Sequence, residues 1–344
     1  MRMTKRDLPP VAAILMKPTS PHDRELEREI LAQPTFASGT LQFVRRLSAR
    51  HSELLEYSFQ SRDGIKSLVV KQQAWGTNSE RATLQELAKL ARVRTLLGLT
   101  LGRSVPEPLL ALPKRGILVT SKIPGVPLTV ILKKYANRLV GPFRTYTLGE
   151  TARRVGMWLR GFQDATHGEP VPYNRDFYLA DLEKRLSQVQ EKGFEPSLIR
   201  EILQKASLRS APLNGRLIPA AAKHGDFIAQ NILIEDGRVG VVDFEAFGER
   251  EAVYDDLGMF LGYILVLGGR ALYSPKSLDA VRRGFLAGFL GGSTIDQVLF
   301  NIYILKGAVR VIADGSPLTG NWNHFGSVWI LPKLLRDLAS VGAM

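Results

Sequence analysis

The sequence lacks cysteine altogether, which excludes disulfide frameworks, iron–sulfur clusters, thiolate zinc sites and cysteine nucleophiles. Its five histidines never occur as a close pair, so any bound metal is expected to have oxygen ligands. A long hydrophobic run is also missing: the longest uncharged apolar stretch, residues 257–269, is well short of the roughly 20 residues that cross a bilayer. We therefore expect a cytoplasmic protein in which this stretch forms a buried helix.

Length and composition indicate a globular protein of two parts. At about 150 residues per domain, the 344 residues would form two folding units or one two-lobed unit. Hydrophobic residues make up 45% and charged residues 23%, values typical of a chain with a sizeable core. A largely disordered chain is thereby excluded.

The net charge of +13 is concentrated in the N-terminal part of the chain. Residues 1–150 hold 24 basic and 12 acidic residues, residues 151–344 hold 22 and 21, and residues 101–160 hold 11 and 2. The positive electrostatic potential of this excess favours an anionic partner. The partner would be a nucleotide, or an anionic membrane surface that the segment 101–160 would bind peripherally. A solvated helix face is the alternative for this segment, and no nucleic-acid partner is expected.

Hydrophobic patterning predicts a β-rich N-terminal part. Residues 1–35 are expected to form a loosely attached arm that ends in a short helix. Short β-rich runs separated by Asp-Gly and Ser-rich turns then indicate an antiparallel sheet with one main helix. The runs are 41–47, 54–59, 65–71, 108–112 and 116–121; the helix covers about 79–97 and has an apolar stripe of Leu84, Leu87, Leu90 and Leu97.

Helical patterns dominate after Pro124. They cover about 128–139, 146–166, 178–192 and 196–206; a short β segment lies at 231–244, and helices resume toward the C-terminus. The predicted fold class is α+β with an arm (1–35), a β-rich lobe (36–123) and a larger helical lobe (124–344). A cleft between two such lobes is the default ligand site.

The most informative motif is His224-Gly-Asp-Phe-Ile-Ala-Gln-Asn231, followed by Asp243-Phe-Glu. It places three oxygen-bearing side chains, those of Asp226, Asn231 and Asp243, around a turn and a β-hairpin. This spacing suits phosphoryl transfer, in which one carboxylate orients the attacking hydroxyl while an amide and a second carboxylate hold Mg²⁺.

With these residues the chain resembles the protein-kinase-like phosphotransferases, specifically the branch of aminoglycoside phosphotransferases and choline kinases. The resemblance implies a bilobal protein-kinase-like fold that binds ATP in the N-lobe and uses Mg²⁺. It implies Asp226 as catalytic base, Asn231 and Asp243 as metal ligands, and His224 as a structural residue. Gly225 stands where protein kinases have arginine, and Glu245 where they have glycine; both are usual in the small-molecule branch.

The same resemblance assigns residues of the N-lobe to the nucleotide. Lys71 ends an apolar run where the family has a lysine that contacts the α and β phosphates. A glutamate of the following helix pairs with it, and Glu86 is preferred to Glu80 because it lies mid-helix. The glycine-rich phosphate loop of protein kinases is missing, so Ser48 and Ser52 are the expected phosphate contacts.

Two further segments match the family less specifically. Residues 120–125 resemble the hinge that ends in a Pro-Gly turn, so backbone groups near Ser121 and Ile123 are expected to bind the adenine edge. Downstream, Asp256, with Asp255 as runner-up, matches a carboxylate that supports the catalytic loop.

The expected function is transfer of the γ-phosphate of ATP to a hydroxyl of a small molecule or saccharide. A kinase for a lipid-linked or membrane-surface glycan, a protein-serine kinase and a non-catalytic nucleotide-binding module are the alternatives. A polycationic acceptor is disfavoured by the charge balance. A choline-type acceptor would need aromatic rings around its ammonium group, which Trp322, Phe325 and Trp329 could supply unless they pack in a helical core.

Overall fold

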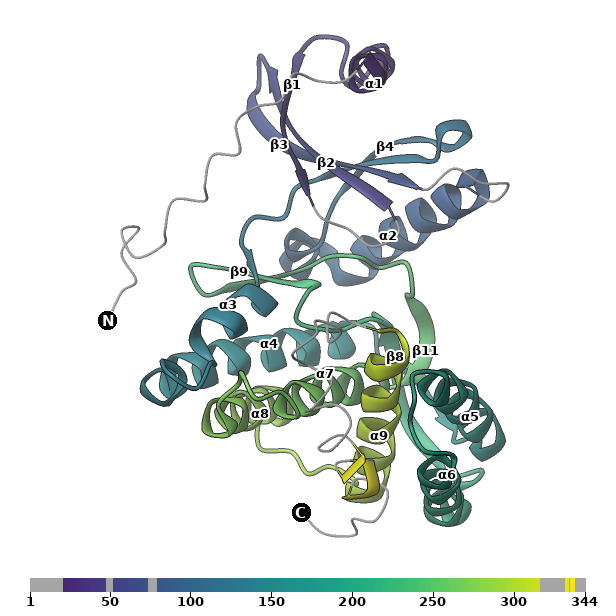
Figure 1. Cartoon of the computed structure of the whole chain (residues 1–344). Coiled ribbons are helices and arrows are strands. Elements are labelled where there is room, and N and C mark those ends of the chain that lie inside the picture. Colours follow the sequence, from purple (N-terminus) through teal and green to yellow (C-terminus); the bar gives the residue numbers. More distant parts are fainter. Residues whose placement is uncertain (1–20, 48–51, 74–78, 316–331, 334, 338–344) are drawn as a thin grey trace. The chain divides into compact units, whose positions relative to one another are not determined.

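The computed structural model describes residues 21–47, 52–73, 79–315, 332–333 and 335–337. The chain divides into two compact units, Met1–Pro124 (unit 1) and Gly125–Met344 (unit 2), whose elements are labelled in Figure 1. This division lies one residue from the boundary expected between residues 123 and 124. Within the described ranges, none of the helices has the length and hydrophobicity that a membrane span requires.

Unit 1 is built around a five-stranded antiparallel sheet with the strand order β1-β2-β3-β5-β4. The predicted antiparallel sheet is thus confirmed. The Asp63-Gly64 turn joins β2 to β3, and Gly64 has a φ of 114°, which glycine adopts without strain. The strands are β1 (Thr40–Leu47), β2 (Ser52–Ser61), β3 (Gly64–Gln73), β4 (Pro108–Leu112) and β5 (Ile117–Ser121).

The first described helix, α1 (Pro21–Leu31), is an integral part of unit 1. Its residues Leu26 and Ile30 lie one helical turn apart and are 1% and 0% exposed, packed in one core cluster with Phe36 and Tyr57. The expectation of a loosely attached arm is therefore wrong for residues 21–35, the part of it that the structure describes. The apolar spacing of four places both side chains on one helix face, which the sheet covers.

The second helix, α2 (Ser79–Leu101), contacts β4 and β5, and the predicted apolar stripe is buried at Leu90 and Leu97 only. Leu84 was expected in the apolar stripe and is 46% exposed. Glu86 lies on the buried face instead, because it pairs there with a lysine of the sheet. That face comprises Thr83, Glu86, Leu90, Val93 and Leu97.

Unit 2 combines helices with two three-stranded sheets, of order β10-β9-β6 and β11-β8-β7. The four helices predicted between 128 and 206 are confirmed, with ends that differ by at most four residues. The helices are α3 (Leu128–Tyr135), α4 (Thr145–Ala165), α5 (Arg175–Glu191), α6 (Pro196–Ser210), α7 (Tyr254–Gly268), α8 (Pro275–Leu290) and α9 (Gln297–Ala313). The strands are β6 (Val126–Pro127), β7 (Gly168–Pro172), β8 (Leu217–Lys223), β9 (Ile232–Glu235), β10 (Arg238–Val241) and β11 (Gly248–Ala252).

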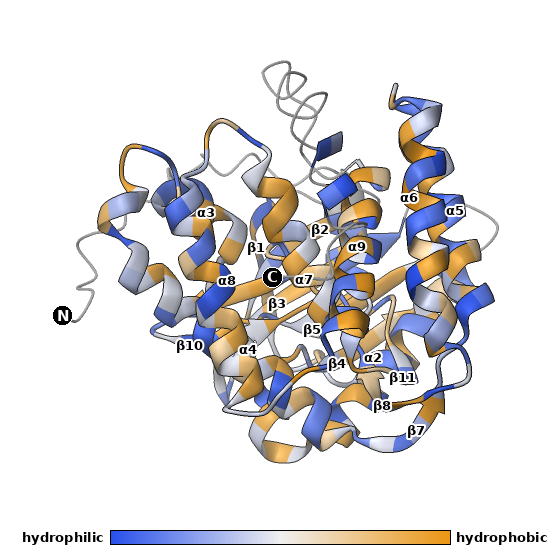
Figure 2. Cartoon of the chain, turned by 90° about the horizontal axis from the view of Figure 1, so that it is seen from below, coloured by the Kyte–Doolittle hydropathy of each residue, from blue (hydrophilic) through white to orange (hydrophobic). Residues whose placement is uncertain are grey.

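Helix α7 is the hydrophobic centre of unit 2 and appears largely orange in Figure 2. It contains most of the apolar run 257–269, so the predicted buried helix is confirmed. Helix α9 packs against it at very short range through glycines: a Cβ atom at Gly258 would overlap the carbonyl of Tyr303, and one at Gly307 would overlap the carbonyl of Gly258. The two backbones are in direct contact.

Candidate active site

The loop between β8 and β9, residues 224–231, carries the His-Gly-Asp motif of unit 2. Gly225 has a φ of 83°, and a Cβ atom there would overlap the carbonyl oxygen of Ala246. Only glycine meets both conditions, because a side chain would be strained by the dihedral angle and would also collide. An arginine at this position would not fit the loop.

His224 is a buried structural residue of this loop. Its side chain is 0% exposed, and burial lowers the pKa of the imidazole, so the ring is neutral near pH 7. Nδ1 accepts a hydrogen bond from the backbone N–H of Asp226 at 3.2 Å, which places the proton on Nε2, 2.9 Å from the carbonyl oxygen of Val242. His224 therefore fixes the backbone of the residue that carries the candidate base.

Asp256, in the first turn of α7, holds the same loop from the other side. Its carboxylate is 1% exposed and accepts hydrogen bonds from the backbone N–H groups of His224 (2.6 Å) and Gly225 (2.9 Å). The neighbouring Asp255 instead forms an ion pair with Lys306 of α9, with Oδ1 2.7 Å from Nζ. Asp256 is thus the carboxylate that contacts the loop.

Asp226 lies at the centre of the loop, and its carboxylate is oriented by Asn231. Nδ2 of Asn231 donates to the carbonyl oxygen of Asp226 and to its Oδ2, both at 2.9 Å. Burial raises the pKa of the Asp226 carboxyl above its ordinary value; the Arg310 guanidinium opposes this increase, whereas the charge of Asp243 adds to it. The sequence analysis named Asp226, Asn231 and Asp243 as site residues, but it did not name Arg310.

Arg310 approaches the loop from α9. Its Nη1 donates to the carbonyl oxygen of Gly225 at 2.6 Å, and its Nη2 lies 3.9 Å from Oδ1 of Asp226. Asp314, one helical turn further, accepts from Nε at 3.4 Å. The guanidinium therefore places a positive charge beside Asp226 and holds the loop backbone at the same time. Arg310 is 84 residues from Asp226, and no motif signals it.

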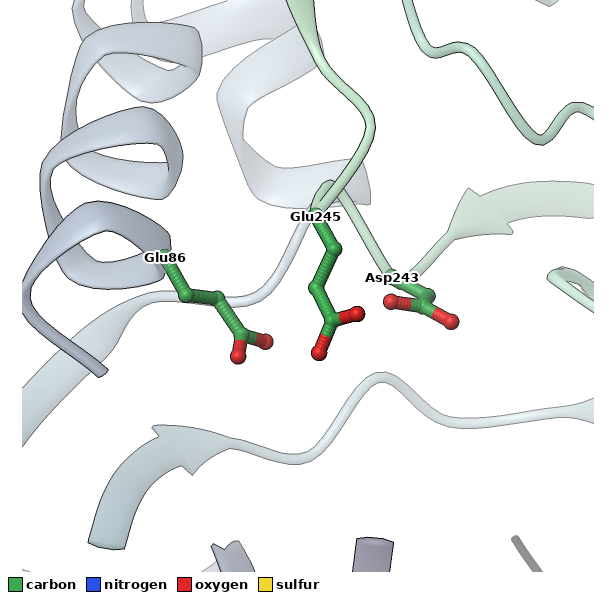
Figure 3. A group of neighbouring side chains, drawn as sticks. All are labelled: Glu86, Asp243 and Glu245. Atoms are coloured by element: carbon green, nitrogen blue, oxygen red, sulfur yellow. The ribbon is translucent and has the colours of Figure 1, made fainter. Parts of the chain in front are cut away.

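The candidate metal ligands of unit 2 lie on the loop and just after β10. Asp243 has a φ of 69°, a left-handed conformation that is uncommon outside glycine and that Asp tolerates better than most residues. Its carboxylate oxygen lies within 4.8 Å of a carboxylate oxygen of Glu245, and Figure 3 shows both side chains projecting from the same segment. Because the nitrogen of the Asn231 amide holds Asp226, its oxygen is the atom suited to a cation. This all-oxygen set fits a hard divalent cation such as Mg²⁺.

Glu245 is a candidate ligand that the sequence analysis treated only as a departure from the protein-kinase pattern. A glutamate two residues after a metal-binding aspartate was the available signal. Its proximity to Asp243 concentrates negative charge in one segment, and a cation would relieve the repulsion.

A cavity of about 150 Å³ lies in unit 2 beside this loop. Its charged side chains are paired: Lys306 with Asp255 (2.7 Å) and Arg185 with Asp314 (2.7 Å). Acids and bases thus both line this small space, together with Gly225 of the loop. The lining residues are Phe177, Asp181, Arg185, Lys223, Gly225, Asp255, Asp256, Met259, Tyr303, Lys306, Gly307 and Arg310.

The candidate nucleotide residues of unit 1 centre on Lys71 of β3. Its Nζ lies 2.9 Å from Oε1 of Glu86, so Glu86 is the glutamate of α2 found in this ion pair. Gln73 donates to the other oxygen of Glu86 at 3.1 Å, and Figure 3 shows Glu86 projecting from α2. The carboxylate holds the lysine at a defined position on the sheet.

The expected hinge and phosphate-loop residues are less well defined. The N–H of Ser121 donates to the carbonyl of Glu107, and its hydroxyl accepts from the N–H of Glu107, both at 2.8 Å. Ser121 therefore uses these groups within the sheet, while Ile123 is buried at the end of unit 1. Ser48, like Trp322, Phe325 and Trp329, lies outside the described residues, and of Ser52 only the backbone, at the start of β2, is described.

Comparison with known proteins identifies the family. The model of the phosphotransferase enzyme family matches residues 44–297, which is more than half of the chain. The chain belongs to this family. The phosphotransferase is accordingly a kinase, as its motifs indicated. No curated protein sequence matches it.

Solved structures share the fold of this phosphotransferase at low sequence identity. A glucosamine kinase in complex with glucosamine, ADP and inorganic phosphate has a TM-score of 0.60 and 19% identity, over 93% of this chain and 88% of its own. A thermostable aminoglycoside phosphotransferase APH(4)-Ia mutant, with ADP and hygromycin B, has a TM-score of 0.57 and 13% identity, over 93% and 100%. A choline/ethanolamine kinase family protein from Mesorhizobium loti has a TM-score of 0.50 and 18% identity, over 92% and 97%. The α+β protein-kinase-like fold is thereby confirmed.

Proposed function

We propose that this phosphotransferase moves the γ-phosphate of ATP to a hydroxyl of a small molecule or saccharide and requires Mg²⁺. The observation that carries the proposal is the geometry around Asp226, whose carboxylate is oriented by Asn231 and lies beside the Arg310 guanidinium. A carboxylate fixed in this way can orient an acceptor hydroxyl and take its proton as the oxygen attacks. We place the enzyme in the cytoplasm because the reaction consumes ATP.

In the proposed mechanism the chain contributes positioning and charge. Asp226 accepts the hydroxyl proton, while His224 and Asp256 keep the loop backbone fixed during the transfer. Asn231 and Asp243, with Glu245 as a further candidate, would hold Mg²⁺, which when bound neutralises charge on the phosphates. We propose Lys71, held by Glu86, as the phosphate contact of unit 1, with Ser48 and Ser52 as phosphate contacts and with Ser121 and Ile123 near the base.

The proposed acceptor is neutral and rich in hydroxyl groups. The cavity beside the loop presents paired acids and bases, so donors and acceptors are both within reach of a ligand. A saccharide can bond to both kinds of group, whereas a polycation would meet Lys306 and Arg185 as well as the acids. One structural neighbour is a complex with the amino sugar glucosamine, which supports a sugar scaffold in the acceptor but not its neutrality.

A kinase for a lipid-linked or membrane-surface glycan is the second candidate. It is favoured by the segment 126–149 of unit 2, which holds four bases and no acid, and in which Leu139, Phe143 and Tyr146 are each at least 85% exposed. Such a segment would place the enzyme at a membrane surface. The chemistry, transfer of a phosphoryl group to a hydroxyl, would be the same for both candidates.

The test of the proposed function is incubation of the protein with γ-labelled ATP and Mg²⁺ in a cell extract separated into polar metabolites, lipids and proteins. We expect label in the polar fraction, or in the lipid fraction for the second candidate, and none when Mg²⁺ is chelated. Label only in the protein fraction would instead indicate a protein kinase. ATP binding without transfer to any fraction would indicate a non-catalytic binding module.

Replacing Lys71 by methionine should weaken ATP binding by about tenfold to a hundredfold, because a hydrogen bond to a charged group contributes about 1.5 to 3 kcal/mol. Glu86→Gln should act in the same direction but more weakly, since the lysine remains and loses only its ion-pair partner. Titration calorimetry with ATP measures both. Lys66→Met, an exposed lysine on the same strand, is the matched control, and equal effects at both lysines would contradict the assignment.

Replacing Arg310 by alanine should lower kcat by about tenfold to a hundredfold with little change in the KM for ATP. The reason is that Arg310 positions Gly225 and Asp226 in unit 2, whereas the proposed ATP phosphate contacts lie in unit 1. Arg310→Lys should recover part of the loss, because it restores the charge but not the forked hydrogen bonds. A rise in the KM for ATP with unchanged kcat would overturn this role.

A further inference from the structure

A surface of unit 2 combines protruding apolar side chains with basic residues. Leu139, Phe143 and Tyr146 are 85%, 86% and 86% exposed, and Leu272 is 56% exposed. We call this the basic–apolar surface. It also includes the bases Lys133, Lys134, Arg138, Arg144 and Lys276, each of them exposed.

Two chain segments that are far apart in sequence form this surface together. The backbone N–H of Arg138 donates to the carbonyl of Leu272 at 3.0 Å, and its Nε donates to the carbonyl of Ala271 at 2.6 Å. An isolated β-bridge joins Asn137 to Tyr273, and the N–H of Ser274 donates to the carbonyl of Ala136 at 2.8 Å. The exposed Leu272 is thereby held next to the turn that carries Leu139.

The turn is held by its own hydrogen bonds, so the exposure of its side chains is built in. Oδ1 of Asn137 accepts from the backbone N–H groups of Leu139 (3.0 Å) and Val140 (2.9 Å). A short 3-10 helix, η4 (Gly141–Phe143), follows, and Gly141 packs so closely against Ser277 that a Cβ atom would overlap its hydroxyl. The apolar tips therefore face outward on a fixed backbone.

The charge of the two segments has one sign. Residues 126–149 contain four bases and no acid, and residues 257–278 contain two bases and no acid. Of the acids next to these segments, Asp256 is buried against the catalytic loop, while Glu150 pairs with Arg153 and Asp279 with Arg282 at the helix surface. Lys134 also lies 4.8 Å from the centre of the Tyr135 ring, so an aromatic face and a cation adjoin. The surface is complementary to a partner that is anionic outside and apolar beneath.

We propose that the basic–apolar surface binds an anionic lipid bilayer. Lysine and arginine pair with anionic headgroups, while leucine, phenylalanine and tyrosine side chains enter the interfacial region below them. Nucleic acid fits less well, because the aliphatic side chains of Leu139 and Leu272 offer no aromatic face on which a base could stack. This inference is independent of the proposed phosphotransfer, because it concerns binding alone.

The surface is connected to the catalytic loop within the same unit. The N–H of Thr129, at the start of α3, donates to the carbonyl of Ala229 in the loop at 3.0 Å, and β6 pairs with β9. A bilayer bound at this surface would thus hold the loop at a defined orientation to the membrane. An acceptor attached to a lipid would then approach the catalytic loop from the membrane.

The test is co-sedimentation of the full chain, without ATP, with phosphatidylcholine vesicles that either contain or lack phosphatidylserine. We expect binding only to the vesicles that contain phosphatidylserine, and weaker binding at high salt. The double variant Leu139→Ser with Phe143→Ser should lower the partition coefficient by about tenfold or more, because it removes two apolar anchors. Lys133→Gln with Lys276→Gln should also weaken binding, through charge.

The matched control is Leu208→Ser with Leu217→Ser, two leucines of unit 2 that are 69% and 66% exposed and lie outside the surface. This variant should bind as the unchanged protein does, and circular dichroism of both double variants checks that they are folded. Absence of binding to anionic vesicles, or an equal loss in both double variants, would overturn the inference. Undiminished binding by the Leu139→Ser, Phe143→Ser variant would overturn it as well.

Discussion

Turnover of the phosphotransferase should fall by about 10²- to 10⁴-fold when Asp226 is replaced by asparagine, equivalent to about 3 to 5 kcal/mol in the barrier. The affinity for ATP should remain close to that of the unchanged protein. The reason is that asparagine retains the shape of the side chain and can still accept the hydrogen bond from Asn231, but it cannot accept the hydroxyl proton. Single-turnover kinetics with saturating ATP measure the effect directly.

The substitution separates a chemical role from a structural one. If Asp226 only stabilised the loop, Asp226→Asn would change the melting temperature and leave turnover nearly intact. Asp279→Asn in α8 is the control, because that carboxylate pairs with Arg282 and Arg283 at the surface. Unchanged turnover in a folded Asp226→Asn protein would remove the base from the proposed mechanism.

Replacing Asp256 by alanine should lower the free energy of unfolding by about 2 to 4 kcal/mol. Its carboxylate is the acceptor for two backbone N–H groups, those of His224 and Gly225, and the variant would leave both without this partner in a buried loop. Part of the cost is offset because a buried charge disappears; burial already raises the pKa of the Asp256 carboxyl. Urea denaturation followed by circular dichroism measures the change.

A series at neighbouring positions tests the cause. Asp256→Asn should be intermediate, since the amide oxygen can accept one hydrogen bond while the amide nitrogen faces the second N–H. Asp255→Ala, in the same helical turn, should cost less than Asp256→Ala, because its partner Lys306 keeps a second carboxylate nearby, that of Asp181 at 3.9 Å. Equal losses at Asp255 and Asp256 would mean that the two loop hydrogen bonds contribute little.

Much of the fold could be predicted because it follows from local patterns. The strands of unit 1 alternate in hydrophobicity between Asp-Gly and Ser-rich turns, and the run 257–269 has no polar face. The spacing from Asp226 to Asn231 and Asp243 likewise depends on one loop and one hairpin, so sequence distance approximates spatial distance there. The roles of these residues in the reaction remain predictions that the variants above test.

The rest depends on partners that are distant in sequence. Helix α2 has apolar residues on more than one face, and burial of Val93 in place of Leu84 depends on its contacts with β4 and β5. Leu26 and Ile30 form an ordinary apolar pair whose burial depends on a sheet that begins nine residues after α1 ends. Nothing in the sequence around Arg310 distinguishes it from the other arginines, because its contacts with Gly225 and Asp226 form only when α9 packs on α7. No pattern within a short window contains this information.

The contact between α7 and α9 joins the two helices whose side chains bind the backbone of Gly225 in the catalytic loop. Asp256 stands on one helix and Arg310 on the other, and Gly258 and Gly307 let the two backbones touch. Both glycines should therefore tolerate substitution poorly, because each lets the two helices that hold the catalytic loop approach closely. In a library of random variants, alanine at either glycine should be lost as strictly as changes in the loop itself. Enzymes evolved toward new acceptors should keep both glycines, including Gly307 at the cavity, while the other cavity-lining residues change.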